Sequence, residues 1–287
     1  SVVADFTLGI TPYDKYKGHS QELIKLRKYH STSKLGNEYK PLISGTNIVR
    51  YAVSNKIEEY IKYGNWLGAP REERFFNEPR ILIRQIVSGR PPRIYAGYTD
   101  QSLYYTQIGF GIIPRPNTIE VKALLALINS KLLNFFHKYS FLDLEKELFQ
   151  KILIANCKKF PIKNSLIGNT SSLPSMSDKM TNLNKDFLTL VENFVQFFSG
   201  KFELEIVSKN LSNWTQLDFS EFLKELKKAK VKLSLSEEAE WMQYFNEQKQ
   251  NAQAIKAEID RADKEIDQMV YELYGLTEEE IKIVEES

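Results

Sequence analysis

Six arginines lie close together in a chain that otherwise relies on lysine. They fall within residues 71–93 and are six of the ten arginines in the sequence: Arg71, Arg74, Arg80, Arg84, Arg90 and Arg93. The guanidinium group is a flat fork of N–H donors that matches phosphate oxygens and the major-groove acceptors of guanine. Because the ammonium group of lysine is a point charge, it discriminates less among such acceptors. The cluster therefore predicts a surface that binds nucleic acid.

A strand is expected to present part of this cluster. The run RILIRQIV at residues 80–87 is rich in β-branched residues. Because side chains alternate along a strand, Arg80 and Arg84 should share one exposed face, while Ile81 and Ile83 face the core. The last two arginines of the cluster follow in the turn sequence SGRPPR.

Acidic residues in the same run leave a second interpretation open. Glu72, Glu73 and Glu78 are available to pair with individual arginines. For any one arginine a structural role is therefore favoured slightly over a base contact. For the cluster as a whole, nucleic acid remains the favoured partner.

The two parts of the chain differ in charge. Residues 1–165 contain 25 lysines and arginines against 14 aspartates and glutamates, and residues 166–287 contain 14 against 23. The first part therefore carries a net charge of +11 and the second −9, in agreement with +2 for the whole chain. A basic globular module is a candidate for binding a phosphate backbone. A solvated acidic helix pair would produce the same imbalance.

Composition narrows the class of protein. The chain has 287 residues and is 42% hydrophobic, enough for one large domain or two ordinary ones. No apolar run is long enough to span a membrane, and we see no signal peptide. Cys157 is the only cysteine, so intrachain disulfides are impossible and a cytoplasmic location is expected. The three histidines have no companion cysteines or close-spaced pair, and no metal site is expected.

No catalytic motif stands out in the sequence. The Pro91-Pro92 pair lacks the acceptor and the aromatic residue of an amino-methyltransferase loop. Gly109 and Gly111 lie in a strand-like run rather than in a glycine-rich cofactor loop. The Pro-Asp dipeptide of common metal-dependent nucleases does not occur. We therefore expect no catalytic residue in this chain.

The first part, residues 1–165, is expected to be a mixed α/β domain. Further strand-like runs are VVADFTLGI, RIYAGY and YYTQIGFGII. A helix is expected around Gln21–His30. A stronger one, IEVKALLALINSKLLNFFHKY, should begin after an N-cap at Asn117 or Thr118.

The second part, residues 166–287, is expected to be a helical spacer, so that the fold class is α+β. A polar, turn-rich linker is placed at residues 164–177. Apolar residues then repeat at alternating spacings of three and four from Met180 to Phe197 and again from Ile255 to Leu273. This pattern predicts two long antiparallel helices packed along their length. A shorter helix should start near Asp218, while Ser236 caps the last long helix and Gly275 ends it.

Five sequence blocks, in order along the chain, also resemble a known family. They are GITPYDKYKG, YKPLISGTNIVRY, YGNWLGAPREERFFNEPRILIRQI, LLALINSKLLNFFHK and FQKILIANCKKFPI. They resemble the TaqI-like C-terminal specificity domain of type IIG restriction–modification enzymes. The C-terminal run IDQMVYELYGLTEEEI is similar to the helix that commonly ends those proteins.

The resemblance implies a target recognition domain that grips double-stranded DNA and reads bases, mainly in the major groove. Separate methyltransferase and nuclease domains, in the same or a partner chain, would then act on the positioned DNA. S-adenosylmethionine and Mg²⁺ are expected for those domains, and no cofactor for this chain. Because the chain begins at Ser1 and lacks catalytic motifs, we expect a fragment or subunit of a larger enzyme.

The resemblance also divides the residues into scaffold and contact groups. Shared motif residues should build the scaffold: Tyr63, Gly64, Trp66, Leu67, Pro70 and Arg71. Base readers are expected in the loops at residues 15–20, 34–39, 88–93 and 99–107. The residues expected to contact DNA are Lys15, Lys17, Lys34, Arg74, Arg80, Arg84, Arg90, Arg93 and Arg115. Most should touch phosphates, which position without specifying, and Arg84, Arg90 and Arg93 are the candidates for base readout.

Three alternatives remain open on sequence grounds. The chain could be a self-contained nuclease with an unrecognised active site. It could instead be a protein-interaction scaffold whose basic face meets an acidic partner. RNA binding is disfavoured only by the family resemblance.

Overall fold

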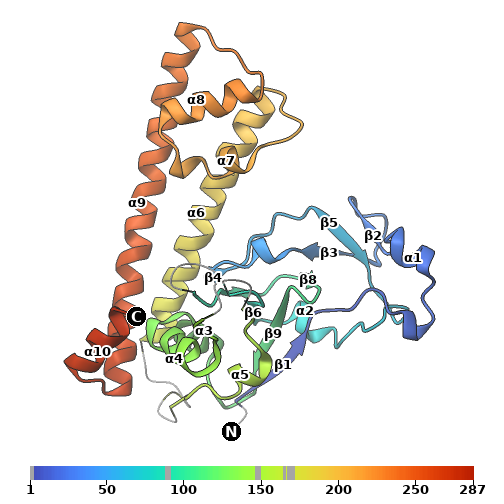
Figure 1. The fold of residues 1–287 in the computed structure, drawn as a ribbon, viewed down its shortest axis with the longest axis vertical. Coiled ribbons are helices and arrows are strands. Elements are labelled where there is room, and N and C mark those ends of the chain that lie inside the picture. The colour runs from blue at the N-terminus through green and yellow to red at the C-terminus, as the bar shows by residue number, and fades with distance from the viewer. Residues whose placement is uncertain (1–2, 88–91, 146–149, 164–165, 167–171) are drawn as a thin grey trace. The chain divides into compact units, whose positions relative to one another are not determined.

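A computed structural model describes the chain except for residues 1–2, 88–91, 146–149, 164–165 and 167–171 (Figure 1). The chain forms two compact units. Unit 1 combines Ser1–Thr181 with Asp263–Ser287, and unit 2 is Asn182–Ala262. The units have these bounds because residues 263–287 pack with the first part of the chain. The expected domain division between residues 165 and 166 stays a prediction.

Unit 1 contains a five-stranded sheet in the order β1-β9-β6-β7-β4. Neighbouring strands are antiparallel except for β7 and β4, which are parallel. Ile81, Leu82 and Ile83 in the central strand β6 are all fully buried. A strand covered on both faces has a continuous apolar run, as the sequence of β6 has. The strands are Ala4–Leu8 (β1), Tyr51–Ala52 (β4), Arg80–Arg84 (β6), Ala96–Thr99 (β7) and Gly109–Pro114 (β9).

A second, four-stranded sheet has the order β2-β5-β3-β8. Its strands are His30–Ser31 (β2), Tyr39–Ile43 (β3), Glu59–Lys62 (β5) and Tyr104–Tyr105 (β8). The pair β3 and β8 is parallel and the other pairs are antiparallel. Tyr104 and Tyr105 share a hydrophobic cluster with Leu82 of β6. The second sheet therefore covers the face of β6 that carries Leu82.

The helix Val121–Asn129 (α3) packs on the five-stranded sheet, where it contacts β4, β6 and β7, and the helix Lys131–Phe141 (α4) packs against α3. The expected single helix was wrong at this point. Ser130 is extended (φ −65°, ψ 154°), and its hydroxyl accepts a hydrogen bond from the backbone N–H of Leu133. Ser130 therefore ends one helix and caps the next. Asn117 has a φ of 58°, and the first helix begins after Glu120 rather than after Asn117 or Thr118.

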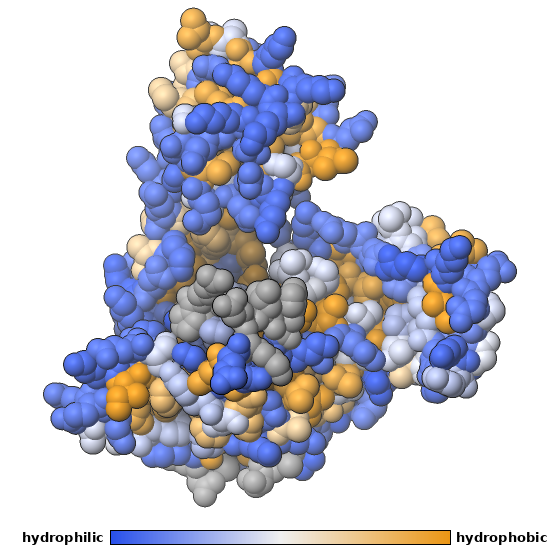
Figure 2. Space-filling model, in the orientation of Figure 1, coloured by the Kyte–Doolittle hydropathy of each residue, from blue (hydrophilic) through white to orange (hydrophobic). Residues whose placement is uncertain are grey.

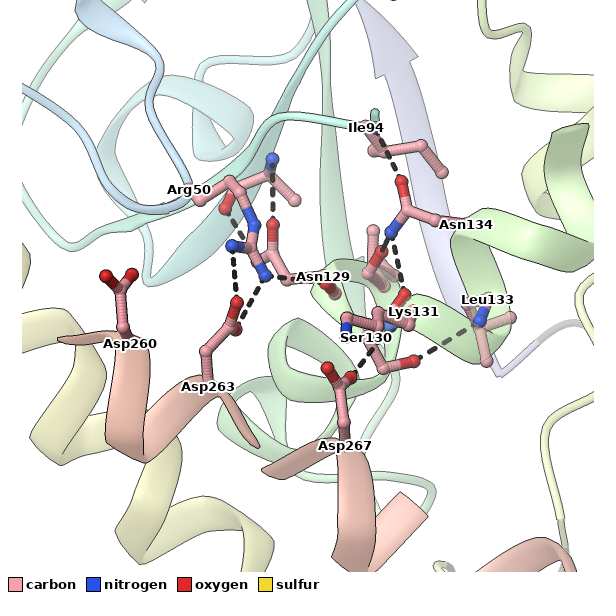
Figure 3. A network of polar contacts seen from close by, with 12 residues as sticks. Arg50, Ile94, Asn129, Ser130, Lys131, Leu133, Asn134, Asp260, Asp263 and Asp267 are labelled. Carbon is pink, nitrogen blue, oxygen red and sulfur yellow. Dashed lines mark hydrogen bonds and ion pairs between the residues drawn. The ribbon is translucent and has the colours of Figure 1, made fainter. Parts of the chain in front are cut away.

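The C-terminal end of the chain belongs to unit 1. The helix Leu235–Tyr274 (α9) brings Asp263 to Arg50, whose Nη1 and Nη2 donate to the two carboxylate oxygens at 2.8 and 2.7 Å (Figure 3). Arg50 Nη2 also donates to the carbonyl of Asn129 at 2.9 Å. Four residues further along α9, Asp267 accepts a hydrogen bond of 2.8 Å from the backbone N–H of Lys131. These contacts attach α9 to the junction of α3 and α4.

Unit 2 is a helical bundle with an aromatic core. The helices that contribute to it are Leu173–Lys201 (α6), Lys209–Ser212 (α7), Phe219–Lys228 (α8) and α9. The ring of Phe194 in α6 lies 6.0 Å from that of Phe245 in α9, and that of Phe202, further along the chain, lies 4.9 Å from Trp241. Later residues of one segment meet earlier residues of the other, so the predicted antiparallel packing and the α+β class are confirmed.

Several predicted element ends were confirmed and others were wrong. Asp218 caps α8 and Gly275, with a φ of 68°, follows the end of α9. The hydroxyl of Ser234, not Ser236, accepts from the N–H of Glu237 near the start of α9. Leu173 already begins α6 inside the expected linker. The remaining short α-helices in the described residues are Gln21–Lys25 (α1), Arg74–Asn77 (α2), Ile154–Cys157 (α5) and Glu278–Glu285 (α10).

Among the described residues, no helix is both long and apolar enough to cross a membrane.

Candidate nucleic-acid interface

Arg80 lies inside unit 1 and does not project from it. Its side chain is 0% exposed. Nη1 donates to the carbonyl of Glu78 at 2.7 Å, and Nη2 donates to the carbonyls of Gln101 and Leu103 at 2.9 and 3.0 Å. Burial lowers the pKa of the guanidinium to about 10, so it stays charged at neutral pH. The expectation that Arg80 contacts DNA from an exposed face was wrong, because the side chain is buried and two of its three bonds tie the loop before β8 to β6.

The alternation of side chains along β6 was predicted correctly. The sequence did not predict that the second sheet covers the face that carries Arg80 and Arg84. Arg80, Leu82 and Arg84 do lie on one face, and that face meets the second sheet. Leu82 lies in the hydrophobic cluster of that sheet. The Cγ and Cδ atoms of Arg84 lie close to Gly45, just after β3. Sequence alternation shows which side chains share a face, but it does not show what packs against that face.

Arg74 and Arg115 hold a single carboxylate between them. Arg74 Nη2 lies 3.0 Å from one oxygen of Asp5, and Arg115 Nε lies 2.8 Å from the other. Arg74 Nε also pairs with Glu72 at 2.9 Å. These bonds hold the pKa of Asp5 below its usual value. Two of the predicted DNA contacts therefore have acidic partners within the fold, and the pair of Arg74 with Glu72 is of the kind that the alternative interpretation of the arginine cluster proposed.

The remaining arginines of the cluster are dispersed. The guanidinium of Arg84 lies 4.8 Å from the centroid of the Tyr95 ring. Arg93 is half-buried and lines a cavity of about 160 Å³ together with Lys138 and Glu285. Arg71 Nε donates to the carbonyl of Gly9 at 3.4 Å. Arg90 lies outside the described residues, so the structure does not describe its contacts.

The three predicted lysines do lie on the surface. Lys15 and Lys17 belong to a 3₁₀ helix, Lys15–Lys17 (η1), and Lys34 lies in the connection between β2 and β3. All three are exposed, and in the part of the chain that the structure describes none of them forms an ion pair. Tyr16 between the first two is 87% exposed. We call Lys15, Tyr16, Lys17 and Lys34 the lysine loops.

A group of aromatic rings holds the first lysine loop against the second sheet. The rings of Tyr13 and Tyr29 stack at 5.2 Å, with an angle of 6° between their planes. The hydroxyl of Tyr13 lies 2.9 Å from His30 Nδ1 and accepts from the N–H of Tyr29 at 2.9 Å. Burial lowers the pKa of His30, so this imidazole is largely neutral at pH 7. These contacts hold Tyr13, two residues before η1, against the edge strand β2.

His19 connects this loop to a neighbouring one. Its Nδ1 accepts from the backbone N–H of Asp14 at 3.0 Å, and its Nε2 lies 2.8 Å from the carbonyl of Trp66. Because a carbonyl only accepts, the proton of a neutral His19 is assigned to Nε2. The sequence pointed to the histidines only as possible metal ligands, so this role of His19 was not predicted. The sequence did offer one signal of a closed turn at this place. Asp14 caps η1 at its start, and Gly18, with a φ of 84°, ends it.

The described residues contain no group of three histidines, cysteines or acids arranged to hold a metal ion.

Two family models match the chain. Residues 40–162 match the TaqI-like C-terminal specificity domain, and residues 168–270 match a domain of unknown function, DUF8810. The first match confirms the family resemblance seen in the sequence blocks. The second covers most of α6 and α9.

A curated relative comes from Methanocaldococcus jannaschii. It is the putative type II restriction enzyme and methyltransferase RM.MjaORFECS2P, 27% identical over 176 residues. The match covers 58% of this chain and 15% of the relative. The chain thus spans a small part of the length of that protein.

A similar solved structure is that of MmeI, a type IIL restriction–modification enzyme in complex with DNA. The match covers 88% of this chain and 36% of the MmeI chain, with 14% sequence identity and a TM-score of 0.35. A likeness at this level supports no conclusion about individual contacts.

Proposed function

We propose, from the match of residues 40–162 to the TaqI-like C-terminal specificity domain, that the chain recognises a specific sequence in double-stranded DNA. The bound DNA is thereby positioned for an adenine methyltransferase and an endonuclease. These activities belong to other domains of the same or a partner chain, and S-adenosylmethionine and Mg²⁺ belong with them.

The family match is the single observation that carries this proposal. The geometry supports a division of labour among the basic residues. Arg80 and the group of Arg74, Arg115 and Asp5 are occupied within the fold. The lysine loops are exposed and have no ion pairs in the described part of the chain. Exposed cations are available to bind phosphates, whereas cations with internal partners stabilise the fold.

In the proposed complex the lysine loops bind phosphates of the DNA backbone. Lysine suits this contact, because its ammonium group is a point charge that can approach a phosphate from any direction. Tyr16, exposed between two lysines, adds a ring that can pack on the sugar–phosphate backbone. Arg84 and Arg93 are proposed to read base edges, and Arg90 is proposed with them from outside the described residues.

The proposal is tested by selecting preferred sites from random duplexes and then measuring affinity for a selected and a scrambled site. The wild-type chain is expected to prefer the selected duplex. The variant with Lys15→Glu, Lys17→Glu and Lys34→Glu should bind both duplexes about tenfold or more weakly. The slope of log affinity against log salt concentration should become less negative by about 2–3, because each lost phosphate contact reduces its magnitude by about 0.9.

A matched control carries the same charge change on exposed lysines elsewhere: Lys179→Glu, Lys264→Glu and Lys282→Glu. This control should keep most of the wild-type affinity and slope. Equal losses in both variants would show that only net charge matters. A wild-type chain that enriches no sequence would contradict specific recognition.

A further inference from the structure

The helical unit carries a cluster of exposed lysines on α8 and just beyond it. The run FLKELKKAKVK at residues 222–232 has five lysines and one glutamate, although residues 166–287 carry a net charge of −9. We call these lysines the α8 lysine cluster: Lys224, Lys227, Lys228, Lys230 and Lys232. All five side chains are exposed. In the view of Figure 2 the surface over α8 is largely hydrophilic.

The packing of α8 fixes which way the cluster points. Phe222 and Leu226 are buried in the aromatic core of unit 2, at 0% and 1% exposure. Lys224, Lys227 and Lys228 have the i, i+3, i+4 spacing of residues on one helical face. All three line one open groove of about 640 Å³, so the lysine face turns away from the core.

The two acids that line the same groove have partners in the helical unit, and Glu225 is paired with one member of the cluster, Lys228. Glu225 accepts hydrogen bonds from Lys228 Nζ at 2.6 Å and from Asn210 Nδ2 at 3.2 Å. Glu221 accepts from the backbone N–H of Asp218 at 2.8 Å and so completes the cap of α8. In the described part of the chain, Lys224 and Lys227 have no ion pair, and neither do the two lysines beyond the helix.

Helix stability does not account for the whole cluster. Lys227 and Lys228 lie in the last turn of α8, where a positive charge interacts favourably with the helix dipole. Lys224 lies a turn earlier, and like charges at this spacing repel each other. Lys230 lies beyond the helix end in a left-handed conformation with a φ of 65°, and Lys232 follows it. An anionic partner would stabilise such an arrangement.

We propose that the α8 lysine cluster binds phosphates of the DNA backbone without regard to base sequence. This inference rests on the proposed function, which brings duplex DNA to the same chain. A helical rise of about 1.5 Å per residue separates Lys224 from Lys228 by about 6 Å along the axis, comparable with the spacing of phosphates along a strand. Lysine without arginine suits phosphate contact rather than base readout. The proposal thereby gives the chain a second DNA contact. This contact lies in unit 2, within the residues that match a domain of unknown function.

The test uses the full chain with Lys224→Glu, Lys227→Glu and Lys230→Glu. Affinity is measured at several salt concentrations for a duplex limited to the selected site and for one extended by long flanks. The affinity of the variant for the extended duplex should be about tenfold or more below that of the wild type. The magnitude of its salt slope should be smaller by about 2–3. Its ratio of affinities for selected and scrambled sites should equal that of the wild type. Hydroxyl-radical footprints on the extended duplex should be shorter.

The control variant Lys179→Glu, Lys264→Glu, Lys282→Glu has the same net charge and should keep the wild-type slope and footprint. Circular dichroism melts check that each variant is folded. Unchanged slope and footprint in the α8 variant, with sequence preference present in the wild type, would overturn this inference alone. Absence of sequence preference in the wild type would overturn the proposed function, and a reduced slope would then still support the backbone contact.

An acidic protein is the competing partner for this cluster. Polyglutamate that displaces the extended duplex from the wild-type chain as effectively as unlabelled DNA would overturn the DNA contact. DNA that competes far better than polyglutamate supports it.

Discussion

Arg80 is a buried cation whose neighbours are mainly backbone carbonyls. Its terminal nitrogens bind three of them, from Glu78, Gln101 and Leu103. An arginine suits this position because its planar fork reaches several acceptors from one fixed orientation, whereas lysine would reach fewer. The arginine-rich character of residues 71–93 therefore reflects internal structure at Arg80 and local ion pairing at Arg74.

Replacing Arg80 by Met is expected to destabilise unit 1. Met approximates the length of the side chain but has no donor, so three carbonyls lose their partner. The free energy of unfolding should fall by about 2–4 kcal/mol, measured by urea titration with circular dichroism. Arg115→Met, which removes a half-exposed ion pair, should cost no more than about 1 kcal/mol.

The opposite pattern would restore Arg80 as a DNA contact. It would consist of wild-type stability in Arg80→Met together with lost affinity for the selected duplex.

What the sequence could predict at this scale depended on the kind of residue. The exposed positions of Lys15, Lys17 and Lys34 followed from polar, turn-rich loops. The burial of Arg80 could not be predicted, because β6 and β8 are far apart in sequence and only the fold brings the second sheet over that face. The bonds of His19 to Asp14 and Trp66 link two loops and likewise have no local signature beyond the turn.

At the level of elements, the long helices and most strands were predictable because their apolar patterns are long and regular. The break between α3 and α4 was not, since apolar residues continue on both sides of Ser130. The cause lies elsewhere in the chain. Asp267 of α9 binds the first free N–H of α4 at Lys131, which adds to the cap provided by Ser130 itself. A helix start can thus be stabilised by a residue more than a hundred positions away.

Asp267 should make stability depend on pH. Burial raises the pKa of its carboxyl from an ordinary 3.8 to about 6. The folded chain therefore binds this proton more tightly than the unfolded chain, and this contribution to stability is lost as pH rises from about 4 to about 6. Asp267→Asn keeps an acceptor for the Lys131 N–H but cannot ionise. The stability of this variant relative to wild type should rise by about 1–3 kcal/mol between pH 4 and pH 7.

Urea titrations at a series of pH values measure this difference. A flat difference for Asp267→Asn would contradict the predicted role of its ionisation.

At the scale of the whole molecule, residues 263–287 complete unit 1. Arg50 and Asp263 form a largely buried pair, with side chains 19% and 15% exposed. Lys163 Nζ donates to the carbonyl of Leu273 at 2.9 Å, and the hydroxyl of Tyr271 donates to Glu285 at 2.7 Å. The sequence predicted the helix but not its return, because its polar face shows no partner until the fold is known.

A fragment of residues 1–165 should therefore be less stable than the same region within the chain. Loss of Asp263 leaves Arg50 as a buried charge without its carboxylate, which costs about 3–5 kcal/mol in comparable cases. Adding a peptide of residues 263–287 should raise the melting temperature of the fragment in a concentration-dependent manner. The same peptide with Asp263→Ala and Asp267→Ala should have little effect. This prediction would be contradicted if the fragment had the melting temperature of the full chain and the peptide did not change it.

Helices α6 and α9 run unbroken through residues 181–182 and 262–263, where the compact units divide. Unit 2 is therefore an insertion whose two joints are both continuous helix. A helical hairpin from another protein could replace unit 2 at these joints, provided that its two helices continue α6 and α9 without a change of helical phase. A graft that adds one residue to a single joint would shift the helical phase there by about 100°, since 3.6 residues make a turn.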